Sequence, residues 1–216
     1  MSDELKLDTK AYAEALLNND VDRAISMMQS DIDRGIASQE VVSKGLIPAI
    51  TIVGEKFQNY EIYVPEMMIA ARVMSKTLAH FKEKLAGEGE AKSLGRVVIG
   101  TVQGDLHDIG KNLVAMILRG QGFEVEDLGV SVGTAKFIQS VKEKQPDILA
   151  MSALLTTTMV EMKRTISALE AEGLRDKVKI IVGGAPVSRE FAEQIGADGH
   201  AYDAPGAANL CKKLIV

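Results

Sequence analysis

An aspartate and a histidine in a glycine-containing loop form the part of this sequence best suited to chemistry. Asp105 and His107 lie in the run Asp-Leu-His-Asp-Ile-Gly, directly after an apolar stretch at 96–101 and before a helical pattern that begins at Lys111. A histidine can bind a metal through one ring nitrogen while a nearby carboxylate accepts a hydrogen bond from the other. Zinc sites need about three or four protein ligands, and this loop offers one. The pattern therefore predicts a single ligand with its own orienting carboxylate, for a metal that arrives already chelated.

Two further segments resemble this loop in position, because each also follows an apolar run directly. Residues 152–158 are small and rich in hydroxyl groups, and Gly183 and Gly184 follow the next apolar run. Hydroxyl groups can bond a polar part of a ligand, and paired glycines let the backbone approach a ligand that a side chain would block. Neither a Walker A lysine nor a G-x-G-x-x-G run is present at the first turn. The three segments together predict a long slot below His107.

The elements that must position these segments alternate between strand and helix. Strands are predicted over 97–101, 123–127, 148–152, 178–182 and 199–202, and helices over 111–119, 135–143, 159–172, 188–195 and 207–214. Five such units predict a doubly wound parallel five-stranded sheet of the flavodoxin-like, Rossmann-type class. In the strand order 2-1-3-4-5, the switch point lies between the first and third strands, where ligands bind at the carboxyl edge. The loop of His107 and Ser152 both fall at that point.

The N-terminal part of the chain has a different pattern. Residues 8–85 show helical periodicity in four stretches, with turn-rich breaks at 18–20, at Gly35 and at 59–65. Four helices of this length predict a small antiparallel bundle. Residues 87–93 are polar and contain glycine, as is typical of a linker. We therefore expect a helical cap domain at 1–86, a linker at 87–95 and an α/β domain at 96–216.

Composition excludes several classes of function. The net charge of −5 and the isoelectric point near 5.3 argue against a nucleic-acid partner, which requires a basic face. No apolar run approaches the roughly 18 residues of a membrane span, and the acidic N-terminus lacks the apolar core of a signal peptide. A single cysteine, Cys211, permits no disulfide within the chain. These features predict a cytoplasmic protein with no membrane partner.

The three segments resemble a known family. The order and spacing of Asp-x-His-x-x-Gly, Ser-x-Leu and Gly-Gly are similar to the signature of cobalamin-binding domains, and the helical half resembles the cap domain that precedes such a domain in methionine synthase. The likeness extends from about residue 10 to 214. The chain thereby looks most like the stand-alone corrinoid proteins of anaerobic methyltransferase systems that serve methanol, methylamines or similar donors.

The resemblance implies a role for individual residues. His107 would be the lower axial ligand of cobalt, Asp105 would orient it, and Thr158 would continue the relay, although methionine synthase has serine at that place. The neighbouring loop residues would also contact the cofactor: Gly104, Leu106, Asp108, Ile109 and Gly110. A slot for the displaced nucleotide tail would be lined by Ser152, Leu154, Thr156, Gly183 and Gly184. Tyr63 and Met68 of the cap would cover the upper face of the corrin.

The implied function is that of a methyl carrier. The protein would hold cobalamin base-off/His-on and alternate between the methylcob(III)alamin and cob(I)alamin states. A substrate-specific methyltransferase would load the methyl group, and an acceptor methyltransferase would pass it to coenzyme M or tetrahydrofolate. A reductive activase would rescue oxidised cobalt. On this interpretation the chain is a carrier subunit that supplies no complete active site alone.

Alternatives remain open at this point. One alternative is a cobalamin-dependent sensor, which shares both domains but needs a DNA-binding module, and no basic segment before residue 10 provides one. Another is the small subunit of an adenosylcobalamin mutase, which usually lacks the cap. Around Pro65, Tyr63, Met67, Met68 and Met74 are either bundle core or cover for the corrin. One of the threonines at 156–158 is also expected to cap the following helix. The glycine pair at 183–184 is equally explained by a tight crossover.

Overall fold

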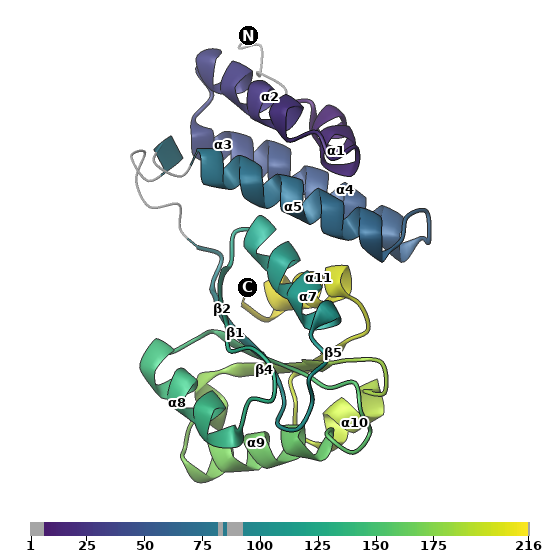
Figure 1. Cartoon of the computed structure of the whole chain (residues 1–216). Coiled ribbons are helices and arrows are strands. Elements are labelled where there is room, and N and C mark those ends of the chain that lie inside the picture. Colours follow the sequence, from purple (N-terminus) through teal and green to yellow (C-terminus); the bar gives the residue numbers. More distant parts are fainter. Residues whose placement is uncertain (1–6, 82–83, 86–92, 216) are drawn as a thin grey trace. The chain divides into compact units, whose positions relative to one another are not determined.

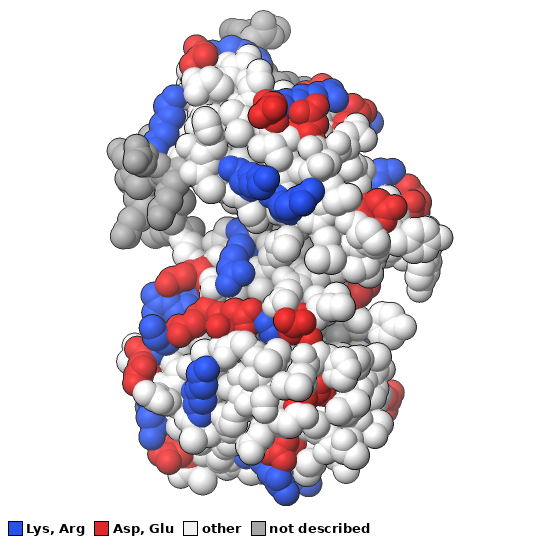
Figure 2. Space-filling model, viewed as in Figure 1, with Lys and Arg blue, Asp and Glu red and all other residues white. Residues whose placement is uncertain are grey.

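The computed structural model describes residues 7–81, 84–85 and 93–215, and the chain divides into two compact units, Met1–Ser93 and Leu94–Val216 (Figure 1). Most of the predicted linker at 87–95 falls outside the described residues, so its limits stay a prediction. No helix in the described part of the chain is both long and apolar enough to cross a membrane. On the face drawn in Figure 2, Lys and Arg side chains lie among Asp and Glu side chains.

The first unit is helical, as predicted. Its described helices are α1 (Thr9–Leu17), α2 (Val21–Asp33), α3 (Ser38–Val41), the π-helix η1 (Val42–Leu46), α4 (Ile47–Gln58) and α5 (Val64–His80). The side chains of Asp8 and Asp20 accept hydrogen bonds from backbone N–H groups in the first turns of α1 and α2, which explains where these helices begin. The third predicted helical stretch, between the breaks at Gly35 and at 59–65, consists of α3, η1 and α4 in succession. Periodicity alone did not predict the π-helical turn within it.

The second unit is a parallel sheet. Its strands are β1 (Arg96–Thr101), β2 (Glu124–Asp127), β3 (Ile148–Ser152), β4 (Lys179–Gly183) and β5 (Gly199–Ala201). They pair in parallel in the order β2-β1-β3-β4-β5, which confirms the predicted flavodoxin-like topology. The connecting helices are α7 (Ile109–Gly120), α8 (Thr134–Lys144), α9 (Val160–Ala171), α10 (Arg189–Gln194) and α11 (Ala204–Ile215), with a short 3-10 turn, η2 (Arg175–Lys177). The last helix begins earlier than predicted because Pro205 is tolerated in a first turn.

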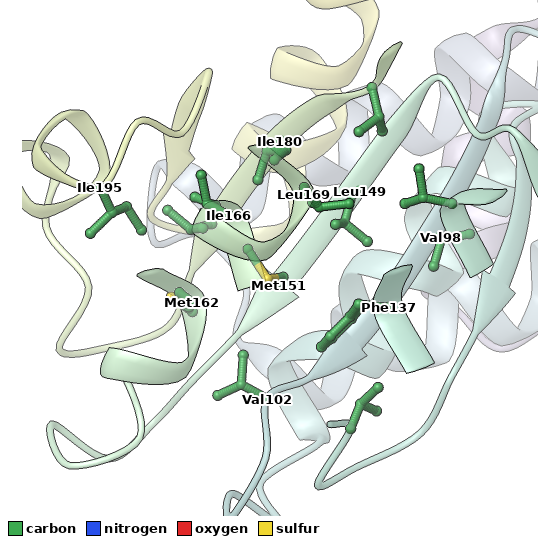
Figure 3. Packing of buried hydrophobic residues seen from close by; sticks show 14 of the residues in the cluster. Val98, Val102, Phe137, Leu149, Met151, Met162, Ile166, Leu169, Ile180 and Ile195 are labelled. Atoms are coloured by element: carbon green, nitrogen blue, oxygen red, sulfur yellow. The ribbon is translucent and has the colours of Figure 1, made fainter. Parts of the chain in front are cut away.

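Helices cover both faces of this sheet. Figure 1 shows α7 and α11 on one face and α8, α9 and α10 on the other. Covering on both faces explains why the central strands are nearly continuous apolar runs. In the close-up of Figure 3, Leu149 and Met151 of β3 lie among Phe137 of α8 and Ile166 of α9, all of them buried. Gly100 makes room for this packing, since a Cβ there would lie 2.9 Å from the Phe137 ring.

Strand register places the predicted site segments next to one another. Thr101, the last residue of β1, pairs with Ser152 at the end of β3, and Ser152 pairs with Gly183 at the end of β4. The loops that follow these three strands therefore begin side by side at the carboxyl edge of the sheet. This edge is where ligands bind in open α/β sheets.

Candidate functional site

His107 is held by a carboxylate on one side of its ring and is open on the other. Its Nδ1 lies 2.8 Å from Oδ1 of Asp105, and its backbone N–H donates to the same oxygen at 3.0 Å. Because an ionised carboxylate has no proton to give, the ring must carry its proton on Nδ1. In the described structure, Nε2 has no hydrogen-bond partner, and 51% of the side-chain surface is exposed. Nε2 is therefore the nitrogen available to an external ligand.

Asp105 is fully buried, and the donors around it explain how its charge is accommodated. Its Oδ2 accepts hydrogen bonds from the backbone N–H groups of Leu154 and Leu155, at 2.8 and 3.1 Å, and from the hydroxyl of Thr158 at 2.8 Å. Burial by itself would raise the pKa of Asp105, but the hydrogen bonds from His107, Leu154 and Thr158 outweigh it and hold the pKa well below its usual range. The carboxylate is therefore ionised at neutral pH.

Thr158 serves Asp105 and does not cap the next helix. Its hydroxyl oxygen lies 2.8 Å from both Asp105 Oδ2 and the carbonyl oxygen of Leu155, and its one proton favours the charged acceptor. Helix α9 begins at Val160, with Met159 as its N-cap and no side-chain hydrogen bond there. The expectation that a threonine of 156–158 caps this helix was wrong, because the Asp105 carboxylate competes for the hydroxyl. The structure thus brings His107, Asp105 and Thr158 into one chain of contacts.

The loop that carries His107 is fixed to the sheet at both ends. The buried hydroxyl of Thr101 donates to the carbonyl oxygen of His107 at 2.9 Å. Beyond the loop, the buried ammonium of Lys111 donates to Asp127 at 2.5 Å and to the side chain of Asn112 at 2.6 Å. Asn112 in turn donates to the carboxylate of Asp108 at 3.0 Å. A buried lysine needs such partners, because an unpaired charge there would be costly.

Large apolar side chains are exposed in the segments that follow the strands of the sheet. Among the described residues of the α/β unit, eight large apolar side chains are exposed, and seven of them follow the carboxyl ends of strands. These seven are Leu106, Ile109, Val130, Leu154, Leu155, Val160 and Tyr202. We call them the apolar rim. Exposed apolar groups gathered in one place mark a binding site, and these would suit a large, mostly apolar ring system.

The fold requires glycine at some positions of the motifs and not at others. At Gly184, with φ +127°, a Cβ would collide with the carbonyl oxygen of Ala153, and at Gly183 a Cβ would lie 2.8 Å from the carbonyl oxygen of Ala201. The fold itself therefore requires this pair. At Gly110, near the start of α7, a Cβ would meet nothing within 4 Å, and the backbone is not left-handed. The fold therefore does not require glycine at this position, and the space beside it is open.

The remaining predicted site residues occupy two places. Ser152 ends β3 and pairs in register with Gly183, and Thr156 is exposed in the loop that follows β3. In the helical unit, Met67 and Met74 are fully buried, whereas Tyr63 is 65% and Met68 41% exposed. The two alternatives for this group thus divide by residue: two are core, and two are free to contact a ligand.

The chemistry of the donor set fits a metal that brings its own chelate. The described residues contain no group of three or more His, Cys, Asp or Glu side chains arranged to hold a metal ion. One oriented imidazole with a buried carboxylate behind it, at a sheet edge that also carries the apolar rim, would suit such a metal, for example the cobalt of a corrinoid.

Comparison with known proteins decides the family. A model described as "B12 binding domain" matches residues 95–208, and a second with the same description matches residues 9–82. The chain belongs to the B12-binding corrinoid proteins. This corrinoid protein is 37% identical to a corrinoid protein of Desulfitobacterium hafniense over 99% of its own length and 96% of the relative's. It is likewise 37% identical to the dimethylamine corrinoid protein of Methanosarcina barkeri, over 94% and 95% of the two chains.

Solved structures agree with this assignment. A cobalamin-binding protein of Desulfitobacterium hafniense superposes with a TM-score of 0.81 at 31% identity, covering 96% of this corrinoid protein and 98% of that chain. The methanol:cobalamin methyltransferase complex of Methanosarcina barkeri matches with a TM-score of 0.83 at 28% identity, covering 100% of this chain and 81% of that one. The cofactor of this corrinoid protein is therefore cobalamin or a related corrinoid, as the motifs predicted.

Several contacts of the site were not anticipated from the sequence. Thr101 is a polar residue at the end of an apolar strand, and that position was the available signal for a site residue. The pairing of Lys111 with Asp127 joins residues 16 apart and has no signature in either segment. Ser131, whose hydroxyl oxygen accepts from the Gly104 N–H, has a left-handed backbone conformation that the sequence does not specify.

Proposed function

We propose that this corrinoid protein carries a methyl group between two methyltransferases, with His107 as the lower axial ligand of cobalt in a base-off/His-on complex. On the donor side we infer a methylamine- or methanol-type methyltransferase, because the relatives that match nearly the whole chain include a dimethylamine corrinoid protein and a methanol methyltransferase complex. On the acceptor side the methyl group would pass to coenzyme M or tetrahydrofolate. A reductive activase and a cytoplasmic location belong to the same proposal.

The observation that supports ligation most directly is the asymmetry of the His107 ring. Nδ1 is 2.8 Å from a buried carboxylate, while Nε2 has no partner in the described structure. Asp105 keeps the ring proton on Nδ1, so the lone pair of Nε2 stays available. Ligation requires neutral imidazole, and a carboxylate that accepts from the far nitrogen increases the basicity of the ligand.

The other residues would bind the cofactor and exclude water. When bound, the corrinoid supplies a cobalt centre that accepts and releases a methyl group. The apolar rim, including Leu106 and Ile109, would contact the ring, and Gly110 would leave it space. Gly104 and Asp108 flank the histidine in the same loop. Desolvation of this kind strengthens polar interactions within a site and suppresses side reactions.

A slot and a cover complete the proposal. Ser152, Leu154 and Thr156 would contact the displaced nucleotide tail, together with Gly183 and Gly184. Ser152 and Gly183 lie opposite each other at the ends of adjacent strands, and the Ser152 and Thr156 hydroxyls are the polar groups suited to bond the tail. Tyr63 and Met68, exposed in the helical unit, would cover the opposite face of the corrin.

The experiment uses the cobalt(II) form, in which an axial nitrogen splits the electron paramagnetic resonance lines. The apo-protein is reconstituted anaerobically with cob(II)alamin, with and without ¹⁵N-histidine. Ligation by His107 predicts a triplet splitting that becomes a doublet with the label, which distinguishes a histidine from the base of the cofactor. His107→Ala should abolish the ¹⁵N doublet of the labelled protein, and His80→Ala, at an exposed position, should preserve it. A labelled doublet that persists in His107→Ala would contradict the proposal.

Methyl transfer is tested separately. The reduced holoprotein is incubated with purified methylamine-type or methanol-type methyltransferases and their donors, and methylation of the cofactor is followed by its visible spectrum. Methylation with one of these partners supports the carrier function. No methylation with any of them, in a holoprotein that shows the histidine splitting, would contradict the assignment of the donor while leaving ligation intact.

A further inference from the structure

Ser131, in the loop between β2 and α8, forms two hydrogen bonds with the segment that precedes His107. Its hydroxyl oxygen accepts from the backbone N–H of Gly104 at 3.0 Å. Its own backbone N–H donates to the carbonyl oxygen of Asp105 at 2.9 Å. One residue thus binds two consecutive residues of the neighbouring loop. The second of these residues, Asp105, carries the carboxylate that orients the histidine.

The loop of Ser131 is itself anchored to β1. Leu128 N–H donates to the carbonyl oxygen of Ile99 at 2.8 Å, and Thr101 exchanges hydrogen bonds with Gly129 and Val132 at 3.0 and 2.8 Å. The Asp127 carboxylate accepts from the Gly129 N–H at 2.9 Å. A loop tied to the sheet in this way can hold another loop in place.

The backbone of Ser131 indicates that the surrounding contacts fix its conformation. Its φ of +49° lies in the left-handed region, which is uncommon for a residue other than glycine, asparagine or aspartate. Such a conformation persists only when surrounding interactions over-determine it. Here the left-handed turn is what allows one residue to present both its hydroxyl and its N–H to the same loop.

We propose that Ser131 is a positioning residue of the relay, which holds the Gly104–Asp105 backbone so that the Asp105 carboxylate stays aligned with His107. Asp105 is also held by its own N–H, which donates to the carbonyl oxygen of Val102 at 3.1 Å. Gly104, with φ +80°, is the turn between these two points. In the described structure Ser131 forms no hydrogen bond with the imidazole and contacts the backbone of Gly104 and Asp105, so we expect it to act through Asp105. The effect on cobalt ligation rests on the proposed function, whereas the contact with the loop does not.

Three variants separate the hydroxyl from the backbone strain. Ser131→Ala removes the hydroxyl and keeps the strained backbone, and Ser131→Gly removes the hydroxyl and relieves the strain. Ser131→Asn supplies another acceptor oxygen, and asparagine tolerates the left-handed region. Ser75→Ala, at an exposed serine in α5 of the helical unit, is the matched control.

The first measurement is backbone amide exchange in the apo-protein, followed by nuclear magnetic resonance. Loss of one hydrogen bond should speed exchange at Gly104 by about threefold to tenfold in Ser131→Ala and Ser131→Gly. Ser131→Asn should restore slow exchange, and Ser75→Ala should leave it unchanged. Wild-type exchange at Gly104 in both Ser131→Ala and Ser131→Gly would overturn the proposal. Recovery in Ser131→Gly alone would also overturn it, because strain and not the hydroxyl would then be responsible.

The second measurement is the fraction of cobalt(II) that shows the ¹⁵N-histidine splitting at fixed pH. In Ser131→Ala and Ser131→Gly the ratio of ligated to unligated cobalt should fall by about threefold to tenfold, with recovery in Ser131→Asn. An unchanged ratio in a variant with fast exchange at Gly104 would overturn the positioning role. Absence of histidine splitting in the wild-type protein would instead refute ligation by His107, and amide exchange would still decide whether Ser131 holds the loop.

Discussion

The imidazole and the backbone N–H of His107 both donate to one oxygen of Asp105, at 2.8 and 3.0 Å. Two donors from the same residue on one buried acceptor fix the ring relative to its own backbone. The other oxygen of Asp105 binds the loop after β3 through Leu154, Leu155 and Thr158. One carboxylate therefore orients the candidate ligand and joins the two loops that meet at the switch point of the sheet.

Replacing this carboxylate by its amide should destabilise the apo-protein and loosen the histidine. In Asp105→Asn a neutral group, with an N–H₂ in place of one oxygen, would face several N–H donors. We expect a loss of about 2–3 kcal/mol in the free energy of unfolding at pH 7. This is the scale of hydrogen bonds to a charged group, which the variant lacks. Denaturant unfolding of both apo-proteins measures this difference. Equal stability at pH 7 would show that the charge of Asp105 is not used in the fold.

The same pair of proteins predicts a pH dependence. The pKa of Asp105 is lowered in the folded state, so its contribution is fully present above the ordinary carboxyl pKa and is lost as the pH falls below it. The difference in stability between wild type and Asp105→Asn should therefore be constant from pH 7 to about 5 and shrink on further acidification. Unfolding curves of the two proteins at each pH test this. A difference that grows on acidification would contradict the assigned direction.

Thr158 offers a test of the far end of the relay. Thr158→Val keeps the shape of the side chain but removes the hydroxyl, and Thr158→Ser keeps the hydroxyl. We expect Thr158→Val to cost about 1–2 kcal/mol in the free energy of unfolding and to lower the fraction of histidine-ligated cobalt, because Asp105 loses one donor. Thr158→Ser should retain both properties.

Thr165→Val is the matched control, because this threonine is also buried but bonds Thr134 on the neighbouring helix. It should lower stability without changing cobalt ligation. If Thr158→Val and Thr165→Val changed the electron paramagnetic resonance spectrum alike, Thr158 would have no special connection to the ligand.

The order of elements was predictable because each local signal agreed with the tertiary structure. Alternating strand and helix patterns specify the sheet, and the positions of Asp105, Ser152 and Gly183 at or just after strand ends specify the edge at which they meet. The predicted strand at 148–152 matches β3 residue for residue. Apolar periodicity was sufficient there because both faces of the sheet are covered.

The contacts that tune the site were less predictable because they depend on backbone geometry. Leu154 was predicted to line a slot, but the donation from its backbone N–H to Asp105 was not anticipated. The π-helical turn at Val42–Leu46 has no periodic signature, and Ser131 acts through a left-handed φ. The composition and spacing of a sequence give information about side chains. These features arise from backbone conformation and from backbone N–H and C=O groups, which nearly every residue possesses.

The glycines of the motifs should respond in opposite ways to alanine. Gly110→Ala, where a Cβ meets nothing within 4 Å, should leave the apo-protein as stable or stabilise it by about 0.5–1 kcal/mol, since alanine favours a helix. The same change should weaken corrinoid binding, because the Cβ occupies space that we assign to the ligand. Gly184→Ala should destabilise the apo-protein, because its Cβ collides with the carbonyl of Ala153. Thermal unfolding of the apo-proteins and titration with hydroxocobalamin separate the two effects; tight binding by Gly110→Ala would contradict the assigned position of the ring.

The apolar rim provides the last test, because its residues are exposed in the protein and would be buried by the cofactor. Leu106 and Ile109 are 71% and 68% exposed, so Leu106→Ser and Ile109→Ser should change the free energy of unfolding of the apo-protein by less than about 0.5 kcal/mol. Each should weaken hydroxocobalamin binding by about tenfold, the scale expected when a large apolar side chain no longer covers a ligand. Leu94→Ser is the control, since Leu94 is 46% exposed but precedes β1 and lies outside the rim. If Leu94→Ser weakened binding as much as the two rim variants did, the loss would reflect a general effect of polarity and the rim would not be the corrin-binding surface.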